Sequence, residues 1–244
     1  MKKTLLAIAI SAIATVSFAD DYMAEVGGLY LEVEKGEVNG DVWGVQGEVY
    51  FDHVDTSNGP LAEAAFLNKV GNVGFAVLTT DDTENGDSNE VYILDTRFVA
   101  SSNIILEASY STDDDDSEYS VGAGTYIGDN SDIVVSYSND ENQDLDQLSV
   151  NFHSLVQLTN TSALSYDLGA AALSNENDDG YGIGAAVTYY PINNIGVGVS
   201  AEYAELGEED ETTYGIHADY FVTDNIRLQA SYLTEDDGSD DNLN

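Results

Sequence analysis

Residues 180–203 read GYGIGAAVTYYPINNIGVGVSAEY, and every second residue on either side of the central turn is apolar or aromatic. Starting from Tyr181 and from Ile195, these residues alternate with small or polar ones. Successive side chains of a β-strand point to opposite faces, so a period of two predicts two strands that each have one apolar face. The short connection at 191–194 predicts that the two strands form a hairpin.

The same period-two pattern covers most of the chain. It gives thirteen segments, most of them close to the about 9–11 residues with which a tilted strand crosses a bilayer. After residue 19, no stretch approaches the roughly 18 apolar residues of a membrane-spanning helix. We therefore predict strands at approximately residues 21–33, 42–53, 71–80, 90–100, 104–112, 118–127, 132–138, 146–157, 162–173, 180–190, 195–205, 211–222 and 225–234.

The connections between these segments are of two kinds that alternate along the chain. Short, nearly neutral connections, such as 101–103 and 191–194, alternate with acidic ones. In an up-and-down antiparallel sheet, alternate connections lie at the same end, so the acidic stretches gather at one end, as the polar loops of membrane barrels do. The acidic stretches, 81–90, 113–118, 140–146, 176–179, 205–211 and 235–241, hold 27 of the 46 acidic residues.

Aromatic residues are expected at two levels along these strands. One level lies beside the acidic connections and the other beside the short turns, which is typical of the two interfaces of a membrane. We therefore predict an all-β fold, a transmembrane antiparallel up-and-down β-barrel, with a secreted β-sandwich as the alternative. The first level comprises Tyr110, Tyr119, Tyr137, Tyr181, Tyr203, Tyr214 and Tyr232, and the second comprises Tyr189, Tyr190, Tyr220 and Phe221.

The composition narrows the class further. The 244 residues carry 46 acids against 6 Lys and Arg, a formal net charge of −40, which excludes nucleic acid as a partner. There is no Cys, so disulfides and thiolate zinc sites are excluded. Residues 1–19 have a basic start, an apolar stretch and small residues before an expected cleavage after Ala19, which is typical of a bacterial secretory signal. The predicted division is a signal peptide, 1–19, and an outer-membrane β-barrel, 20–244, in a Gram-negative bacterium.

The odd number of segments conflicts with this prediction, because bacterial single-chain barrels have an even number of strands. The segment 225–234 runs outward into an acidic stretch, and no returning strand follows it. We therefore expect a barrel of about 14 strands whose closing C-terminal strand is absent from this chain. A barrel of twelve, with the first or last segment outside it, is the alternative.

Residues 59–67 read GPLAEAAFL and follow the predicted strand at 42–53. Together with the signal peptide and the acidic-loop barrel pattern, this motif resembles a group of outer-membrane porins from marine gammaproteobacteria. The resemblance implies a porin and carries over no catalytic residue. The chain departs from that group at its C-terminus, where a closing strand is expected.

The same motif predicts a short helix on the side of the short turns. Pro60 suits a first helical turn capped by Asn58 or Gly59, and Leu61 and Ala64 belong to the side that packs. Tucked into the barrel mouth, this helix is either a plain packed turn, a constriction or a docking element for a partner.

The inward face of the predicted barrel carries the candidates for a pore lining. Arg97 and Arg227 are the only arginines, and on this face they would pair with acids instead of facing lipid, where a charge costs roughly 2–4 kcal/mol. Inward glycines such as Gly196 and Gly198 leave space in the lumen. The charged candidates are Glu48, Asp95, Arg97, Glu107, His153, Asp167, Glu202, His217, Asp219 and Arg227.

The histidines do not form an enzyme site in this prediction. His153 and Ser154 are neighbours on a strand and so point to opposite faces, which excludes that dyad. His217 and Asp219 share the inward face, and a hydrogen bond between them is expected. We therefore expect no catalytic residue and no enzyme activity.

The acidic connections suggest only weak metal binding. Asn175, Asn177 and Asp179 match the start of a calcium loop, but Ala186 stands where a bidentate Glu is needed. We expect no cofactor and no specific metal site. The weak candidates for divalent ions are Asp113, Asp114, Asp115 and Asp116.

These features predict an outer-membrane porin for passive diffusion of small hydrophilic solutes, with a cation preference set by the acidic loops and the lumen charges. A non-conducting structural or adhesive barrel, whose acidic loops bind divalent cations or a partner, is the alternative. The expected partners are outer-membrane lipid, lipopolysaccharide and small solutes or cations. The sequence does not decide between a monomer and a homo-oligomer.

Overall fold

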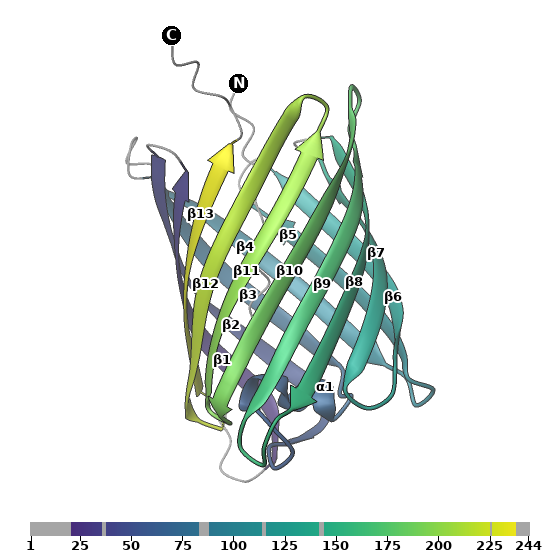
Figure 1. The fold of residues 1–244 in the computed structure, drawn as a ribbon, viewed down its shortest axis with the longest axis vertical. Coiled ribbons are helices and arrows are strands. Elements are labelled where there is room, and N and C mark those ends of the chain that lie inside the picture. The colour runs from purple at the N-terminus through teal and green to yellow at the C-terminus, as the bar shows by residue number, and fades with distance from the viewer. Residues whose placement is uncertain are drawn as a thin grey trace.

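The computed structural model describes residues 21–35, 38–82, 88–113, 116–141, 144–224 and 226–237. In these residues the chain forms a closed barrel of thirteen strands, with one short helical stretch at its lower end in Figure 1. The predicted signal peptide, 1–19, lies outside the described residues. The elements are β1 (Asp21–Lys35), β2 (Val38–Asp55), η1 (Leu61–Glu63), α1 (Ala64–Leu67), β3 (Asn72–Asp82), β4 (Ser88–Val99), β5 (Ile104–Thr112), β6 (Ser117–Tyr126), β7 (Ser131–Asp140), β8 (Leu145–Gln157), β9 (Ala163–Ser174), β10 (Asp179–Ile192), β11 (Ile195–Leu206), β12 (Glu209–Thr223) and β13 (Ile226–Asp237).

The predicted strands are therefore confirmed, with shifts of a few residues at their ends. The segment 104–112 coincides with β5, and the largest difference is at β2, which begins at Val38 instead of residue 42. Among the described residues, no helix has the length and hydropathy that a membrane span requires.

Neighbouring strands along the chain pair antiparallel, and the barrel closes through a parallel pairing of β1 with β13. The parallel register runs from Val26 opposite Ile226 to Lys35 opposite Glu235. Our expectation of about 14 strands is wrong for this structure, and so is the alternative of twelve. Two strands that run in the same direction can pair in a parallel ladder, so an odd number closes the sheet and leaves no free edge.

The outside of the barrel is apolar and the inside is polar. Val199 and Ile216 keep 57% and 59% of their surface exposed, although they lie in the middle of strands. Glu48 and Asp219 are only 7% and 3% exposed. A soluble sandwich would bury the apolar face, so this arrangement is the one that a bilayer requires.

The two ends of the barrel differ. The loop end, at the top of Figure 1, holds the acidic connections, and the turn end, at the bottom, holds the short turns and α1. Near the loop end, the rings of Tyr119 and Tyr137 lie 6.3 Å apart and those of Tyr181 and Tyr203 5.9 Å apart, at the predicted upper level.

The lower aromatic level needs a correction. Tyr189 and Tyr220 are exposed, but Tyr190 and Phe221 are only 4% and 3% exposed. Each is the direct neighbour of an outward aromatic residue, so strand alternation turns it into the barrel.

Candidate functional site in the lumen and at the turn end

The connection between β2 and β3, residues 56–71, folds into the barrel at the turn end, and we call it the mouth segment. Pro60 has an extended backbone (φ −60°, ψ 140°) and precedes η1, which leads directly into α1. Asn68 ends the helix, because its side-chain amide donates to the carbonyl oxygens of Ala64 and Asp55. The predicted short helix is confirmed, but its predicted start is wrong, because Pro60 is itself the N-cap residue and neither Asn58 nor Gly59 caps the helix.

Three apolar clusters hold the mouth segment against different parts of the wall. Ala64 packs with residues of β1 and β2, and Phe66 packs with residues of β5, β6 and β7. Leu67 and Ala62 pack with residues of β8 and β10, together with Ala163 at the start of β9. Because these strands lie on several sides of the closed barrel, the segment crosses the mouth instead of following one wall.

Hydrogen bonds fix the same position. The backbone N–H of Leu61 donates to the carbonyl of Asn193, and the hydroxyl of Tyr126 donates to the carbonyl of Phe66. Lys69 Nζ lies 3.0 Å from the carbonyl oxygen of Gly128 and 3.2 Å from Oδ1 of Asp129. The segment thus narrows the turn end of the lumen.

Glu63 is the charged centre of this contact and is 6% exposed. His153 of β8 stands between two carboxylates, with Nε2 3.0 Å from Glu63 Oε2 and Nδ1 2.6 Å from Asp167 Oδ1. The hydroxyl of Tyr190 donates to Glu63 Oε1 at 2.9 Å. Since ionised carboxylates only accept, a protonated imidazole that donates from both nitrogens suits this position.

The pKa of Glu63 lies below its usual range. Burial alone raises the pKa of this carboxyl, but the hydrogen bond and positive charge of His153 and the hydroxyl of Tyr190 favour the ionised form and outweigh burial. The docking of the mouth segment is therefore coupled to a negative charge on Glu63.

A second charge network crosses the lumen from β4. The guanidinium of Arg97 binds Glu107 of β5 and Asp132 of β7, and it lies 5.7 Å from the ring centre of Tyr126. β4 and β7 are not neighbours in the sheet, so this contact runs through the interior. The predicted pairing of Arg97 with interior acids is thus present.

A third network lies near the closing seam. Arg227 of β13 binds Asp219 of β12, with Nε 3.0 Å from Oδ1, and stacks 5.6 Å from the ring centre of Phe221. On β1, Glu25 accepts hydrogen bonds from the hydroxyls of Tyr22 and Tyr50. Both arginines therefore have interior partners.

The predicted contact between His217 and Asp219 is wrong. His217 Nε2 lies 3.0 Å from the hydroxyl of Thr188 on β10, while Asp219 binds Arg227. The intervening strand carries Gly198, where an added Cβ would lie 2.2 Å from the His217 ring and 2.9 Å from the Thr188 hydroxyl. The glycine permits the histidine to reach across β11.

The remaining candidates also lie on the interior side. Glu48, Asp95 and Glu202 alternate with outward residues on β2, β4 and β11, and no ion pair joins them to a cationic side chain within the described ranges. The ten predicted residues are thus inward, but they form separate networks instead of one cluster.

Comparison with known proteins agrees with this geometry. A family model described as "Putative general bacterial porin" matches residues 1–165. The chain belongs to this porin family. The fold of this porin is similar to that in the crystal structure of the Acinetobacter baumannii outer membrane protein Omp33, with a TM-score of 0.65 and 22% identity over 89% of this chain and 93% of that chain. None of the curated proteins matches the porin.

The membership and the barrel fold point to a bacterial outer membrane and to a porin-like role there. The predicted fold and the predicted family are confirmed. The lining roles of individual residues stay predictions.

The acidic connections of the porin show no metal-binding arrangement among the described residues. The Asp113 carboxylate accepts hydrogen bonds from the backbone N–H of Asp116 in its own loop and from the side-chain amide of Asn89 in β4. Asp114 and Asp115 lie outside the described residues.

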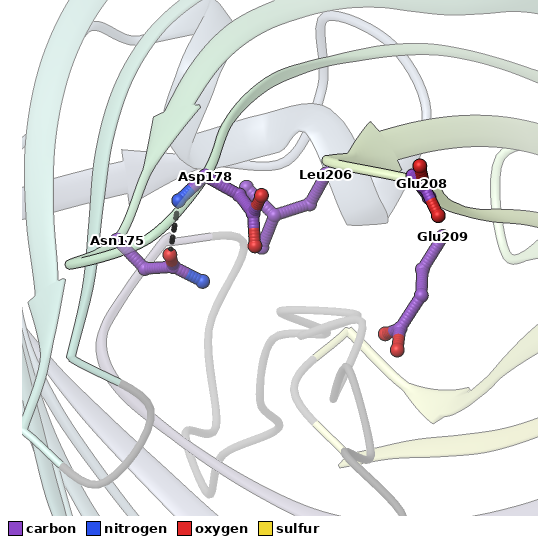
Figure 2. Close-up of a pocket in the computed structure, with 5 residues that line it drawn as sticks. All are labelled: Asn175, Asp178, Leu206, Glu208 and Glu209. Atoms are coloured by element: carbon purple, nitrogen blue, oxygen red, sulfur yellow. Dashed lines mark hydrogen bonds between the residues drawn. The ribbon is translucent and has the colours of Figure 1, made fainter.

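A pocket at the loop end lies between two hairpin turns of the porin. Figure 2 shows Asn175 and Asp178 of one turn opposite Leu206, Glu208 and Glu209 of the other. Asn175 Oδ1 accepts the backbone N–H groups of Asn177 and Asp178, so its side chain closes a tight turn.

Glu63, Asp132 and Glu25 are among the interior acids of the porin that the sequence prediction missed. Glu63 lies in a helical stretch, where strand alternation gives no sidedness. Asp132 shares the phase of Val134 and Ser136 on β7, so alternation within 132–138 could have found it. Glu25 lies just after a register shift in β1, between Tyr22 and Ala24, so alternation counted from the start of the strand does not give its face.

Proposed function

We propose that this porin is a channel for passive diffusion of small hydrophilic solutes, with a preference for cations, in the outer membrane of a Gram-negative bacterium. The apolar exterior and polar interior support the proposal most directly, because a conducting barrel needs water inside and lipid outside. Acidic loops at one mouth raise the local concentration of cations by field focusing.

The mouth segment gives the channel its narrow part. It lies across the turn end and is held by apolar contacts and by Glu63, so it limits the cross-section available to solutes. A change in this segment should therefore alter the conductance, while the strands of the barrel wall keep their fold.

The test is single-channel recording in planar bilayers. We expect stepwise conductance from the purified barrel and a several-fold larger step when residues 58–69 are replaced by a short Gly-Ser turn. Shortening the loop-end turn at 175–178 is the matched control, and it should leave the step size nearly unchanged. Absence of steps from both the native and the shortened barrel would remove the channel proposal.

The second candidate is a non-conducting structural or adhesive barrel. The observation that favours it is the extent of the mouth segment, which contacts several sides of the wall. In that case the acidic loops would act as a surface toward divalent cations, lipopolysaccharide or a partner. The native barrel would then show no steps, and steps would appear only after the mouth segment is removed.

A further inference from the structure

The interior charges of this barrel divide into those that have a cationic partner and those that do not. Arg97 binds Glu107 and Asp132. Arg227 binds Asp219. His153 lies between Glu63 and Asp167. A neighbouring cation offsets much of the negative charge of each of these acids, so the net electrostatic field that they exert on a passing ion is smaller.

Glu48, Asp95 and Glu202 are the inward candidates that have no ion pair in the part of the chain that the structure describes. Glu48 is only 7% exposed, so its carboxylate lies beneath the lumen surface. Asp95 is partly exposed and Glu202 is exposed. Of these three residues, only Asp95 and Glu202 combine a charge that has no ion pair with access to water.

The two carboxylates stand on opposite walls. In the closed strand order, six strands separate β4 from β11 in one direction and five in the other. Figure 1 shows β11 on the near wall and β4 on the far wall. An ion that crosses the lumen therefore passes one of these carboxylates on each wall.

Neighbouring residues strengthen the field of each carboxylate. The Asp95 carboxylate lies over Gly74, which is the register partner of Glu48 on the next strand, so two acids lie near one another on this wall. Glu202 is paired with Thr213 of β12, and Glu211 lies two residues from Thr213 on the same face of that strand. Each wall thus has a negative region around an accessible acid.

We infer that Asp95 and Glu202 set the cation selectivity of the channel, and that the acids already bound to arginine or histidine contribute little. This inference rests on the proposed function, because selectivity exists only if the barrel conducts. It assigns the preference to two lumen positions instead of the acidic loops as a whole.

The chain offers matched controls on the same two strands. Glu90 of β4 and Glu205 of β11 lie on the outward face, where they accept hydrogen bonds from Tyr92 and Tyr203. Glu90→Gln with Glu205→Gln removes the same formal charge as Asp95→Asn with Glu202→Gln. The two double variants therefore separate lumen charge from total charge.

The experiment measures the reversal potential in a tenfold potassium chloride gradient across a planar bilayer. We expect a cation-selective native channel and a fall in the cation-to-anion permeability ratio of about threefold for each inward charge removed, because a charge about 6 Å from an ion in water changes its occupancy by about that factor. The outward pair should leave the ratio nearly unchanged. A heat-dependent shift in gel mobility confirms that each variant is folded.

Equal falls in both double variants would overturn the inference, since they would assign selectivity to overall charge. A native channel that conducts without selectivity would also overturn it; the proposal of a diffusion channel would then stand without its cation preference. If no channel steps appear at all, the proposed function fails and this inference fails with it.

Discussion

The two ends of this barrel differ in the surroundings of their acidic side chains. At the turn end, Glu63 is buried and has partners on two strands, His153 and Tyr190. At the loop end, Glu208 and Glu209 line a pocket open to solvent that has no cationic side chain among its lining residues. Water screens the loop-end charges, whereas a buried charge without partners costs several kcal/mol, so only the turn end requires a defined network.

This difference separates stability from permeation. Charges at the turn end hold the mouth segment in place, and charges at the loop end act on ions at a distance. Substitutions at the first end should therefore change unfolding, and those at the second should leave unfolding unchanged.

The largest effect is expected from Glu63→Ala. The substitution removes one partner of a buried ion pair, and we expect a loss of about 3 kcal/mol in the free energy of unfolding, the lower part of the usual range because His153 keeps Asp167. Urea unfolding in lipid vesicles measures it. Glu176→Ala in the loop-end turn is the control, and equal losses in the two variants would contradict the distinction between the ends.

A smaller contrast compares two tyrosine hydroxyls that donate to carboxylates. Tyr190→Phe removes a buried hydrogen bond to Glu63 and should cost about 1.5–3 kcal/mol. Tyr203→Phe removes the bond to Glu205 at the exposed loop-end level and should leave unfolding unchanged. The same urea titration reports both, and a larger effect of Tyr203→Phe would reverse the comparison.

The pH dependence follows from the lowered pKa of Glu63. A carboxyl whose pKa is lower in the folded state adds stability that is complete above its unfolded pKa of about 4.3 and is lost as the pH falls through the lower folded value. The difference in unfolding free energy between the native barrel and Glu63→Gln should therefore be at its full value at about pH 6 and shrink below about pH 4. Glu176→Gln should show no such change, and a difference that grows toward acid would show the sign to be wrong.

The smallest effect is expected from Lys69→Met. Its partner Asp129 is 95% exposed, so the ion pair should contribute about 0–1 kcal/mol and less at high salt. Unfolding at two salt concentrations measures the change. A salt-independent loss of several kcal/mol would mean that the mouth segment depends on this lysine and not on Glu63.

The sequence predicts what is local and repeated. Alternation along each strand placed Arg97, Arg227 and the other candidates inside, because one strand is enough to define its two faces. It could not provide their partners, since Asp132 is three strands away from Arg97 in the barrel. The register between strands, not the pattern within one, decides such contacts.

Two further features were beyond the pattern for physical reasons. The motif at 59–67 indicates a helix, but the role of Glu63 depends on His153, ninety positions further along the chain. The parallel closure was also missed, because the sequences of β1 and β13 contain the same alternation that an antiparallel pairing would need.

The seam between β1 and β13 also gives the barrel a direction. Because both strands run from the turn end to the loop end, Asp21 and Asp237 stand on opposite sides of the bilayer that the barrel crosses. A membrane-impermeant label attached next to one of these strand ends would report one compartment, and the same label at the other would report the second. In a barrel closed by an antiparallel pair, the start of the first strand and the end of the last strand lie in the same compartment, so the two labels would report the same side.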